Sequence, residues 1–269
     1  MNKITLLGSG TSTGVPILGC KCHVCRSTDV RNKRLRASAL IETSAGKKIL
    51  IDVPPDIRTQ LLRGDVSSLD AVIITHDHAD HTHGMDDLRP FGFSTGLPIP
   101  VYAAADAAKD LRRKFPYIFE RSTYFKDKAI LGGGIPLLDL HEVVPGRHAV
   151  AGESVLLLPM PHGHEDTFAV IHGKCAYVVD CREIPENVLI TLRAAELDVL
   201  VIDCLRLTRH STHLHLELSL EYIRKIQPKL AVLTHMGHEL EHLELLQELK
   251  ARGAKNVVIG TDGASFFYS

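Results

Sequence analysis

One short segment constrains this chain more than any other: Thr75-His76-Asp77-His78-Ala79-Asp80-His81, which directly follows the apolar run Ala71–Ile74. Such a run predicts a buried β-strand. In a chain leaving a strand, residues two apart point the same way, so His76 and His78 can bind one metal ion. Asp80 and His81, one turn further on, can face a second ion. So dense a cluster favours a metal site over solvated side chains at a strand end.

The other histidines are also concentrated in short segments. The chain has 16, and they cluster at 76–83, 162–172, 210–215 and 235–242, mostly at the ends of apolar runs. Asp52 and Asp180 follow apolar runs in the same way. Polar groups gathered at strand ends along one edge of a sheet form the usual site for chemistry in layered folds.

Short apolar runs alternate with amphipathic helical patterns along the whole chain. We expect strands at Ile4–Leu7, Ser38–Glu42, Lys48–Asp52, Ala71–Thr75, Ile99–Ala103, Val155–Pro159, Phe168–His172, Cys175–Asp180, Val199–Asp203, Leu230–Thr234, Val257–Gly260 and Ser265–Tyr268. We expect helices at Pro55–Arg63, Ala105–Phe115, Glu186–Leu197, Leu216–Ile226 and Leu240–Arg252. Interleaved elements of this kind predict an α/β protein with layered sheets and helices outside them.

Charge and hydropathy exclude several classes of partner. The 31 Lys and Arg residues balance 32 Asp and Glu residues, which gives no sign of a surface for polyanions. No apolar run approaches the roughly 18 residues that a membrane span needs. Glycine breaks the N-terminal segment too early for a secretory signal. We therefore expect a cytoplasmic protein with no membrane partner, and nucleic acid as a partner only in the form of small nucleotides.

Three of the six cysteines, Cys20, Cys22 and Cys25, lie within six residues. In a reducing compartment this spacing indicates a metal rather than disulfide bridges, although three unliganded thiols are the alternative.

The pattern His-x-His-x-Asp-His after an apolar strand resembles the signature of the metallo-β-lactamase superfamily. This resemblance implies one domain over residues 1–269, an αββα sandwich of two packed mixed sheets with helices on the outer faces. It also implies that Asp52 orients a ligand and that a binuclear site is formed by His76, His78, His162, Asp80, His81, Asp180 and His235. Asp180 would bridge the two ions. His164 competes with His162 for one ligand position.

Further motifs are similar to the PhnP-like phosphodiesterases. They are Gly8–Pro16, Gly19–Cys25, Gly84–Phe91, Phe115–Phe119, Thr212-His213 and Thr234–His238. The resemblance implies a structural zinc held by Cys20, Cys22, Cys25 and His238, with the cysteines in a loop at about 19–26. A closed set of four such ligands leaves no position for substrate.

The resemblance implies a metal-dependent phosphoric diester hydrolase that acts on small, cyclic phosphodiesters by two-metal activation of a bridging water. Asp80 and His213 would be catalytic, with His213 as general acid; His210 and His215 are its competitors in sequence. Manganese or zinc would occupy the active site, and iron or nickel also suit the ligands. The family further suggests a homodimer.

Three rival interpretations remain open. A tRNA 3′-processing endonuclease shares the ligands, and a PQQ-biosynthesis protein shares the cysteines as well. A zinc-stabilised, non-catalytic binding protein is the alternative from another class.

Overall fold

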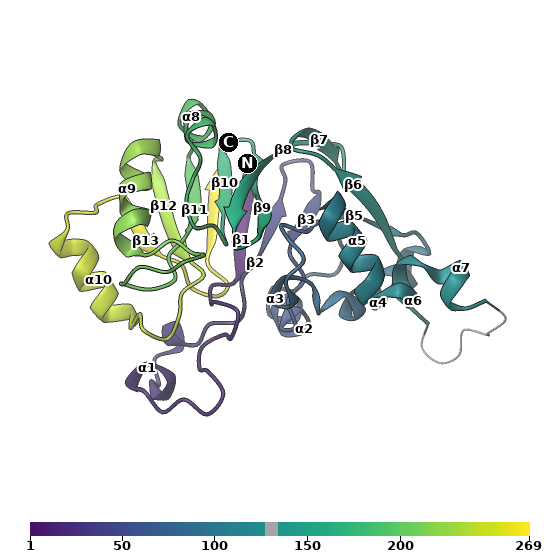
Figure 1. The fold of residues 1–269 in the computed structure, drawn as a ribbon, viewed down its shortest axis with the longest axis horizontal. Coiled ribbons are helices and arrows are strands. Elements are labelled where there is room, and N and C mark those ends of the chain that lie inside the picture. Colours follow the sequence, from purple (N-terminus) through teal and green to yellow (C-terminus); the bar gives the residue numbers. More distant parts are fainter. Residues whose placement is uncertain (127–133) are drawn as a thin grey trace.

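The computed structural model describes residues 1–126 and 134–269 and places the strands in two seven-stranded sheets (Figure 1). In the first sheet the order is β14-β1-β2-β3-β4-β5-β6, and in the second it is β13-β12-β11-β10-β9-β8-β7. The strands of the first sheet are β1 (Asn2–Gly8), β2 (Ser38–Glu42), β3 (Lys48–Ile51), β4 (Ala71–Ile73), β5 (Ile99–Ala104), β6 (Leu138–Val143) and β14 (Ser265–Tyr268). Those of the second are β7 (Gly146–Val150), β8 (Glu153–His162), β9 (Glu165–His172), β10 (Cys175–Val178), β11 (Val199–Asp203), β12 (Leu230–Thr234) and β13 (Val257–Ile259).

Each sheet is half parallel and half antiparallel. In the first, β3, β4, β5 and β6 pair in parallel, and in the second, β10, β11, β12 and β13 do so. The remaining neighbours are antiparallel. Because parallel strands end at the same edge of a sheet, the residues that follow them are collected there.

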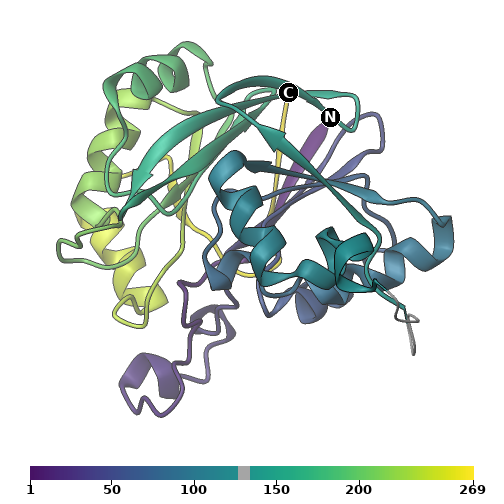
Figure 2. The ribbon, with the colours of Figure 1, turned by 45° about the vertical axis from the view of Figure 1, so that its right-hand side comes forward.

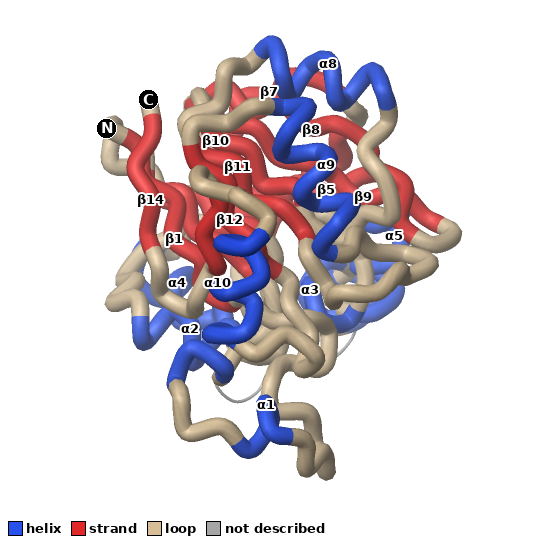
Figure 3. The backbone as a smooth tube through the Cα atoms, turned by 90° about the vertical axis from the view of Figure 1, so that its left-hand side faces the viewer, coloured by secondary structure: helices blue, strands red, loops and turns tan. Residues whose placement is uncertain are grey.

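Helices cover the outer face of each sheet. The helices of the described residues are α1 (His23–Arg26), α2 (Ile57–Arg63), α3 (Ala79–Thr82), α4 (Arg89–Thr95), α5 (Ala105–Lys114), α6 (Pro116–Phe119), α7 (Arg121–Tyr124), α8 (Glu186–Ala194), α9 (Leu216–Ile226) and α10 (His242–Ala251), with 3₁₀ turns η1 (Val30–Asn32) and η2 (Met85–Leu88). Helices α8, α9 and α10 flank the second sheet, and α2, α4 and α5 flank the first (Figures 2 and 3).

Three apolar clusters fill the spaces between the layers. One lies between the sheets and joins side chains such as Ile41 and Val201. A second packs α8, α9 and α10 on the second sheet, and a third packs α2 and α5 on the first. Burial of apolar surface on both faces of each sheet is the main force that holds the layers together. The predicted αββα sandwich is therefore confirmed.

The sequence did not predict β6 and β7. Both are edge strands, one in each sheet. The exposed residues of β6 and β7 leave neither strand with an apolar run. A strand without such a run lacks the pattern by which buried strands are recognised. Among the described residues, no helix combines the length and apolarity required to span a bilayer.

The segment around α1 projects from the body of the sandwich (Figure 1). It contains the three clustered cysteines, and its small apolar cluster consists of Val15, Val24 and Cys25. A cluster of this size buries little surface, so the segment needs further contacts to hold its shape.

Candidate metal centre

The ends of the strands place the candidate ligands at one edge of the sandwich. Asp52 and His235 directly follow β3 and β12, Asp180 follows β10 by two residues, and His162 is the last residue of β8. Asp52, Asp180 and His235 have left-handed backbones, with φ of 63°, 56° and 57°. Strained backbones of this kind cluster at functional sites, where the surrounding structure enforces them.

The first group of ligands consists of His76, His78 and His162. Nε2 of His76 lies 2.9 Å from Nδ1 of His78, and Nε2 of His162 lies 3.3 Å from the same atom. His76 and His162 are buried, whereas His78 is exposed. His164, the competitor of His162, is exposed and lines a cavity whose wall also includes His76. The geometry therefore brings His162 into the group.

The second group surrounds His81. Nε2 of His81 lies 3.2 Å from Oδ2 of Asp80 and 2.8 Å from Oδ2 of Asp180. The other oxygen of Asp180 lies 3.1 Å from Nε2 of His235. Asp180 also groups with His76 and His81, so it lies between the two sets. All seven residues expected at a binuclear site thus converge.

Several buried atoms of this cluster lack hydrogen bonds within the described chain. They are Nε2 of His81, Oδ2 of Asp180 and Nε2 of His235. Buried polar atoms are nearly always hydrogen-bonded, so orphaned atoms that face one another need an explanation. Imidazole nitrogens and carboxylate oxygens are ligands of divalent metals, and the residues fit such ions.

Asp52 orients His81, a member of the second group, through a hydrogen bond on the side of the ring away from the other ligands. Its carboxylate accepts hydrogen bonds from the backbone N–H of Thr75 at 2.8 Å and from Nδ1 of His81 at 2.7 Å. With Nδ1 of His81 donating to Asp52, its Nε2 is the ring atom directed at Asp80 and Asp180. This is the arrangement that the resemblance implied for Asp52.

Asp203 is a site residue that the sequence analysis missed. It ends β11, between the strands that deliver Asp180 and His235, and it is fully buried. Oδ2 of Asp203 accepts a hydrogen bond from Nδ1 of His213 at 3.1 Å, and Oδ1 lies 3.6 Å from Nδ1 of His235. The signal was present in the sequence, because Asp203 ends an apolar strand just as the predicted ligands do.

His213 lies beside the second group rather than within it. Its Nδ1 is 3.1 Å from Asp203 and 3.3 Å from Oδ1 of Asp180, and its ring stacks on that of His235 with 4.9 Å between centroids. His210, one of its competitors, lies on the outer side, 5.1 Å away between ring centroids. His215 is the N-cap residue of helix α9.

The charges of the cluster oppose the effect of its burial. Burial raises the pKa of Asp180, but the positive charges of His235 and His81 outweigh it and hold that pKa well below its usual value. Burial lowers the pKa of His81, yet Asp180 and Asp52 raise it well above the usual range. Metal ligands must be deprotonated, so an ion that binds here displaces the proton of His81.

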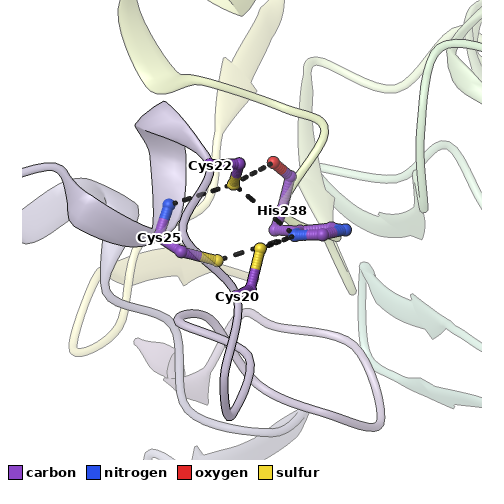
Figure 4. Close-up of side chains that lie close together, drawn as sticks. All are labelled: Cys20, Cys22, Cys25 and His238. Atoms are coloured by element: carbon purple, nitrogen blue, oxygen red, sulfur yellow. Dashed lines mark hydrogen bonds between the residues drawn. The ribbon is translucent and has the colours of Figure 1, made fainter.

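The clustered cysteines converge on the loop that follows β12 (Figure 4). Sγ of Cys20, Cys22 and Cys25 lies 3.3, 3.6 and 3.6 Å from Nδ1 of His238. Tetrahedral zinc with its usual bond lengths places sulfur and nitrogen ligands about 3.5 Å apart. The backbone N–H of Cys25, above all other contacts, lowers the pKa of Cys22 to about 6, so this thiol ionises readily. The four residues fit a structural zinc ion.

Comparison with known proteins agrees with this geometry. A sequence model of the β-lactamase superfamily domain matches residues 47–236. A solved structure described as a new diphosphatase from the PhnP family is 33% identical, with a TM-score of 0.88 over 100% of this chain and 98% of that one.

Two curated proteins are also similar. An octanoyltransferase from Porphyromonas gingivalis is 40% identical over 250 residues, which cover 91% of this chain and 48% of that protein. A coenzyme PQQ synthesis protein B from Rhodopseudomonas palustris is 27% identical over 69% of this chain and 57% of its own length. The chain thus spans about half the length of these relatives. From its matched family domain and its full-length structural relative, the chain belongs to the metallo-β-lactamase superfamily, in the PhnP-like branch.

Proposed function

We propose that this chain is a metal-dependent hydrolase that cleaves small phosphodiesters, cyclic ones included. The observation that carries the proposal is the convergence of two ligand groups on one carboxylate, Asp180, among buried atoms that lack other partners. The likeness to a PhnP-family diphosphatase supports hydrolysis at a phosphoryl group as the class of reaction.

The two groups would hold two divalent ions. His76, His78 and His162 would bind the first, and Asp80, His81 and His235 the second, with Asp180 shared. Such a pair supplies an activated water and neutralises the charge that develops on phosphoryl oxygens. Manganese or zinc suits these ligands, and so do iron and nickel.

His213 would give a proton to the leaving oxygen. Its Nδ1–H donates to Asp203, which fixes the ring and leaves Nε2 on the side away from that carboxylate. A histidine oriented in this way is suited to general acid catalysis. Asp80, a member of the second ligand group, would hold the second ion in the position that it needs to contact the substrate.

Zinc at the cysteine site would have a structural role. Cys20, Cys22 and Cys25 come from the projecting segment, and His238 lies three residues after His235. An ion there would fasten this weakly packed segment to the loop that carries a catalytic ligand.

The test is hydrolysis of bis-p-nitrophenyl phosphate by protein that has been chelated and then reloaded with Mn²⁺ or Zn²⁺. We expect activity only after reloading. Asp80→Asn should remove or loosen one active-site ion, whereas Asp87→Asn, on the exposed surface of η2, is the matched control. Folded, metal-replete protein that cleaves neither this diester nor a panel of small cyclic phosphodiesters would contradict the proposal.

A second candidate function is hydrolysis of an acyl ester or thioester. The observation that favours it is the 40% identity to a protein named for octanoyl transfer, of which this chain spans 48%. Octanoyl thioesters therefore belong in the substrate panel, as does a precursor tRNA for the processing-nuclease alternative. If the protein hydrolyses none of these substrates, the result would favour the non-catalytic binding protein. We also propose that the chain forms a homodimer. Light scattering would test this by measuring its molar mass in solution.

A further inference from the structure

A buried arginine lies against the loop that follows β12. The backbone of Arg34 pairs with that of Val15, a member of the apolar cluster of the projecting segment. Only 1% of Arg34 is exposed. Burial lowers the pKa of Arg34 to about 10, so its guanidinium is still a cation at neutral pH. A buried cation costs free energy that its contacts must offset, so the role of those contacts needs an explanation.

Two of the contacts hold carbonyl groups on either side of His238. Nη1 of Arg34 donates to the carbonyl of Gly237 at 2.9 Å, and Nη2 donates to the carbonyl of Leu240 at 2.7 Å. A guanidinium is planar and rigid, so these hydrogen bonds fix the two carbonyls relative to one another. Nη2 also lies 3.4 Å from the amide oxygen of Asn32, which accepts a backbone N–H at the start of α10. The guanidinium thus joins the projecting segment to the loop between β12 and α10.

This loop carries one ligand of each proposed metal site, His235 and His238. Gly237 lies between them. Its N–H donates to the carbonyl of Leu205 at 2.9 Å, and its own carbonyl accepts from Arg34. Because a peptide group is planar, these bonds fix the peptide groups on both sides of Gly237. Arg34 therefore acts on the backbone that connects the two ligands.

His235 depends on that backbone for its position. The residue is buried, and neither ring nitrogen makes a hydrogen bond within the described part of the chain. Its Nδ1 is 3.6 Å from Oδ1 of Asp203, which is beyond the normal range. Its backbone has a φ of 57°, a strained conformation that persists only where the surrounding structure enforces it. The position of this ligand therefore rests on the loop that Arg34 holds.

We propose that Arg34 is a positioning residue, whose guanidinium holds residues 235–240 in the conformation that the second active-site ion requires. The inference rests on the metal ligands of the proposed function and is independent of its substrate. His76 and His162, ligands of the first ion, lie at the ends of β4 and β8 instead. Loss of the Arg34 guanidinium should therefore affect the second ion selectively, whereas a merely structural role would not distinguish the two ions.

The experiment measures the binding of Mn²⁺. Chelated protein is reloaded with a single equivalent of zinc, which thiolates select over manganese, and is then titrated with Mn²⁺ while electron paramagnetic resonance follows the free ion. We expect Arg34→Met to weaken the second Mn²⁺ by roughly 10–100-fold, the usual effect of removing a group that orients a ligand. The first Mn²⁺ should change by no more than about twofold. Arg34→Lys keeps the cation without the paired donors, so it should retain part of the affinity.

Matched variants assign the effect. Arg31→Met, in the same segment, removes a half-exposed arginine that pairs with Asp29, and it should leave both affinities unchanged. His235→Ala should weaken the same ion as Arg34→Met, and the two substitutions together should be little worse than His235→Ala alone. Cys22→Ser, which disrupts the cysteine site, should weaken the second Mn²⁺ less than Arg34→Met does.

The outcomes separate this inference from the proposed function. If folded Arg34→Met binds both ions as the parent does, or loses affinity for both equally, the positioning role is wrong. If Cys22→Ser is as damaging as Arg34→Met, zinc rather than Arg34 positions His235. If Arg34→Met does not fold, a parent-like affinity in Arg34→Lys overturns the inference. A folded parent protein that binds no second Mn²⁺ refutes the ligand set and this inference with it, whereas one that binds two ions and cleaves no diester refutes the phosphodiesterase alone.

Discussion

Replacing Asp203 by asparagine tests whether the buried carboxylate behind His213 serves the chemistry. The amide keeps the shape of the side chain and removes its charge. The Asp203 carboxylate makes one hydrogen bond of normal length, to Nδ1 of His213 at 3.1 Å, whereas Nδ1 of His235 is 3.6 Å away. A hydrogen bond between charged groups contributes roughly 1.5–3 kcal/mol. Loss of this one contact should therefore lower kcat by about 10–100-fold.

The assay is hydrolysis of bis-p-nitrophenyl phosphate, with the metal content of each sample measured in parallel. Asp198→Asn is the matched control, because Asp198 directly precedes the same strand at its other end and pairs with Lys229. The control should stay within about twofold of the parent protein. Its own effect, if any, should be on stability alone.

A double variant shows whether Asp203 acts through His213. If it does, Asp203→Asn combined with His213→Ala should be no slower than His213→Ala alone. A kcat for Asp203→Asn within twofold of the parent, at full metal content, would refute the reasoning. If kcat falls only in proportion to the loss of metal, the role of Asp203 is to retain the metal by orienting His235.

Three further predictions concern the same centres. His213→Ala should lower turnover by roughly 10²–10⁴ while metal content stays the same, and unchanged turnover would exclude the general acid assignment. Cys22→Ser should remove one zinc ion per chain and lower the melting temperature, with Ser27→Ala as the control; an unaltered zinc content would contradict the site. In metal-free protein, burial lowers the pKa of His235, but Asp180 and Asp203 raise it overall to about 9. A raised pKa stabilises the fold fully below the ordinary value of 6.5, and this contribution is lost as the pH rises through 9. The melting temperature of chelated protein should therefore fall between pH 6.5 and 9.5, and metal-loaded protein should show a smaller fall; equal falls would count against metal binding at His235.

Elements with a clear apolar or aromatic run could be predicted from the sequence, and elements without one could not. The strands β2, β11, β12 and β14 and the helix α9 have the predicted bounds, since each has a strong apolar pattern. The strands β6 and β7 lack one because polar residues interrupt both.

The candidate site follows the same division. The ligands carry a local pattern, since each is a histidine or aspartate at the end of an apolar run. Asp203 has the same pattern, but its role depends on contacts with His213 and His235, which come together only when β11 lies between β10 and β12.

The division of the chain between the two sheets has a consequence for cohesion. Apart from β14, the strands up to Val143 form the first sheet, and those from Gly146 to Ile259 form the second. Each proposed ion takes ligands from both halves, as His76 and His162 illustrate. The cations would thus cross-link the two halves at their junction. A substitution that weakens the binding of either ion should destabilise that junction and impair catalysis. The melting temperature and the turnover would then decline together.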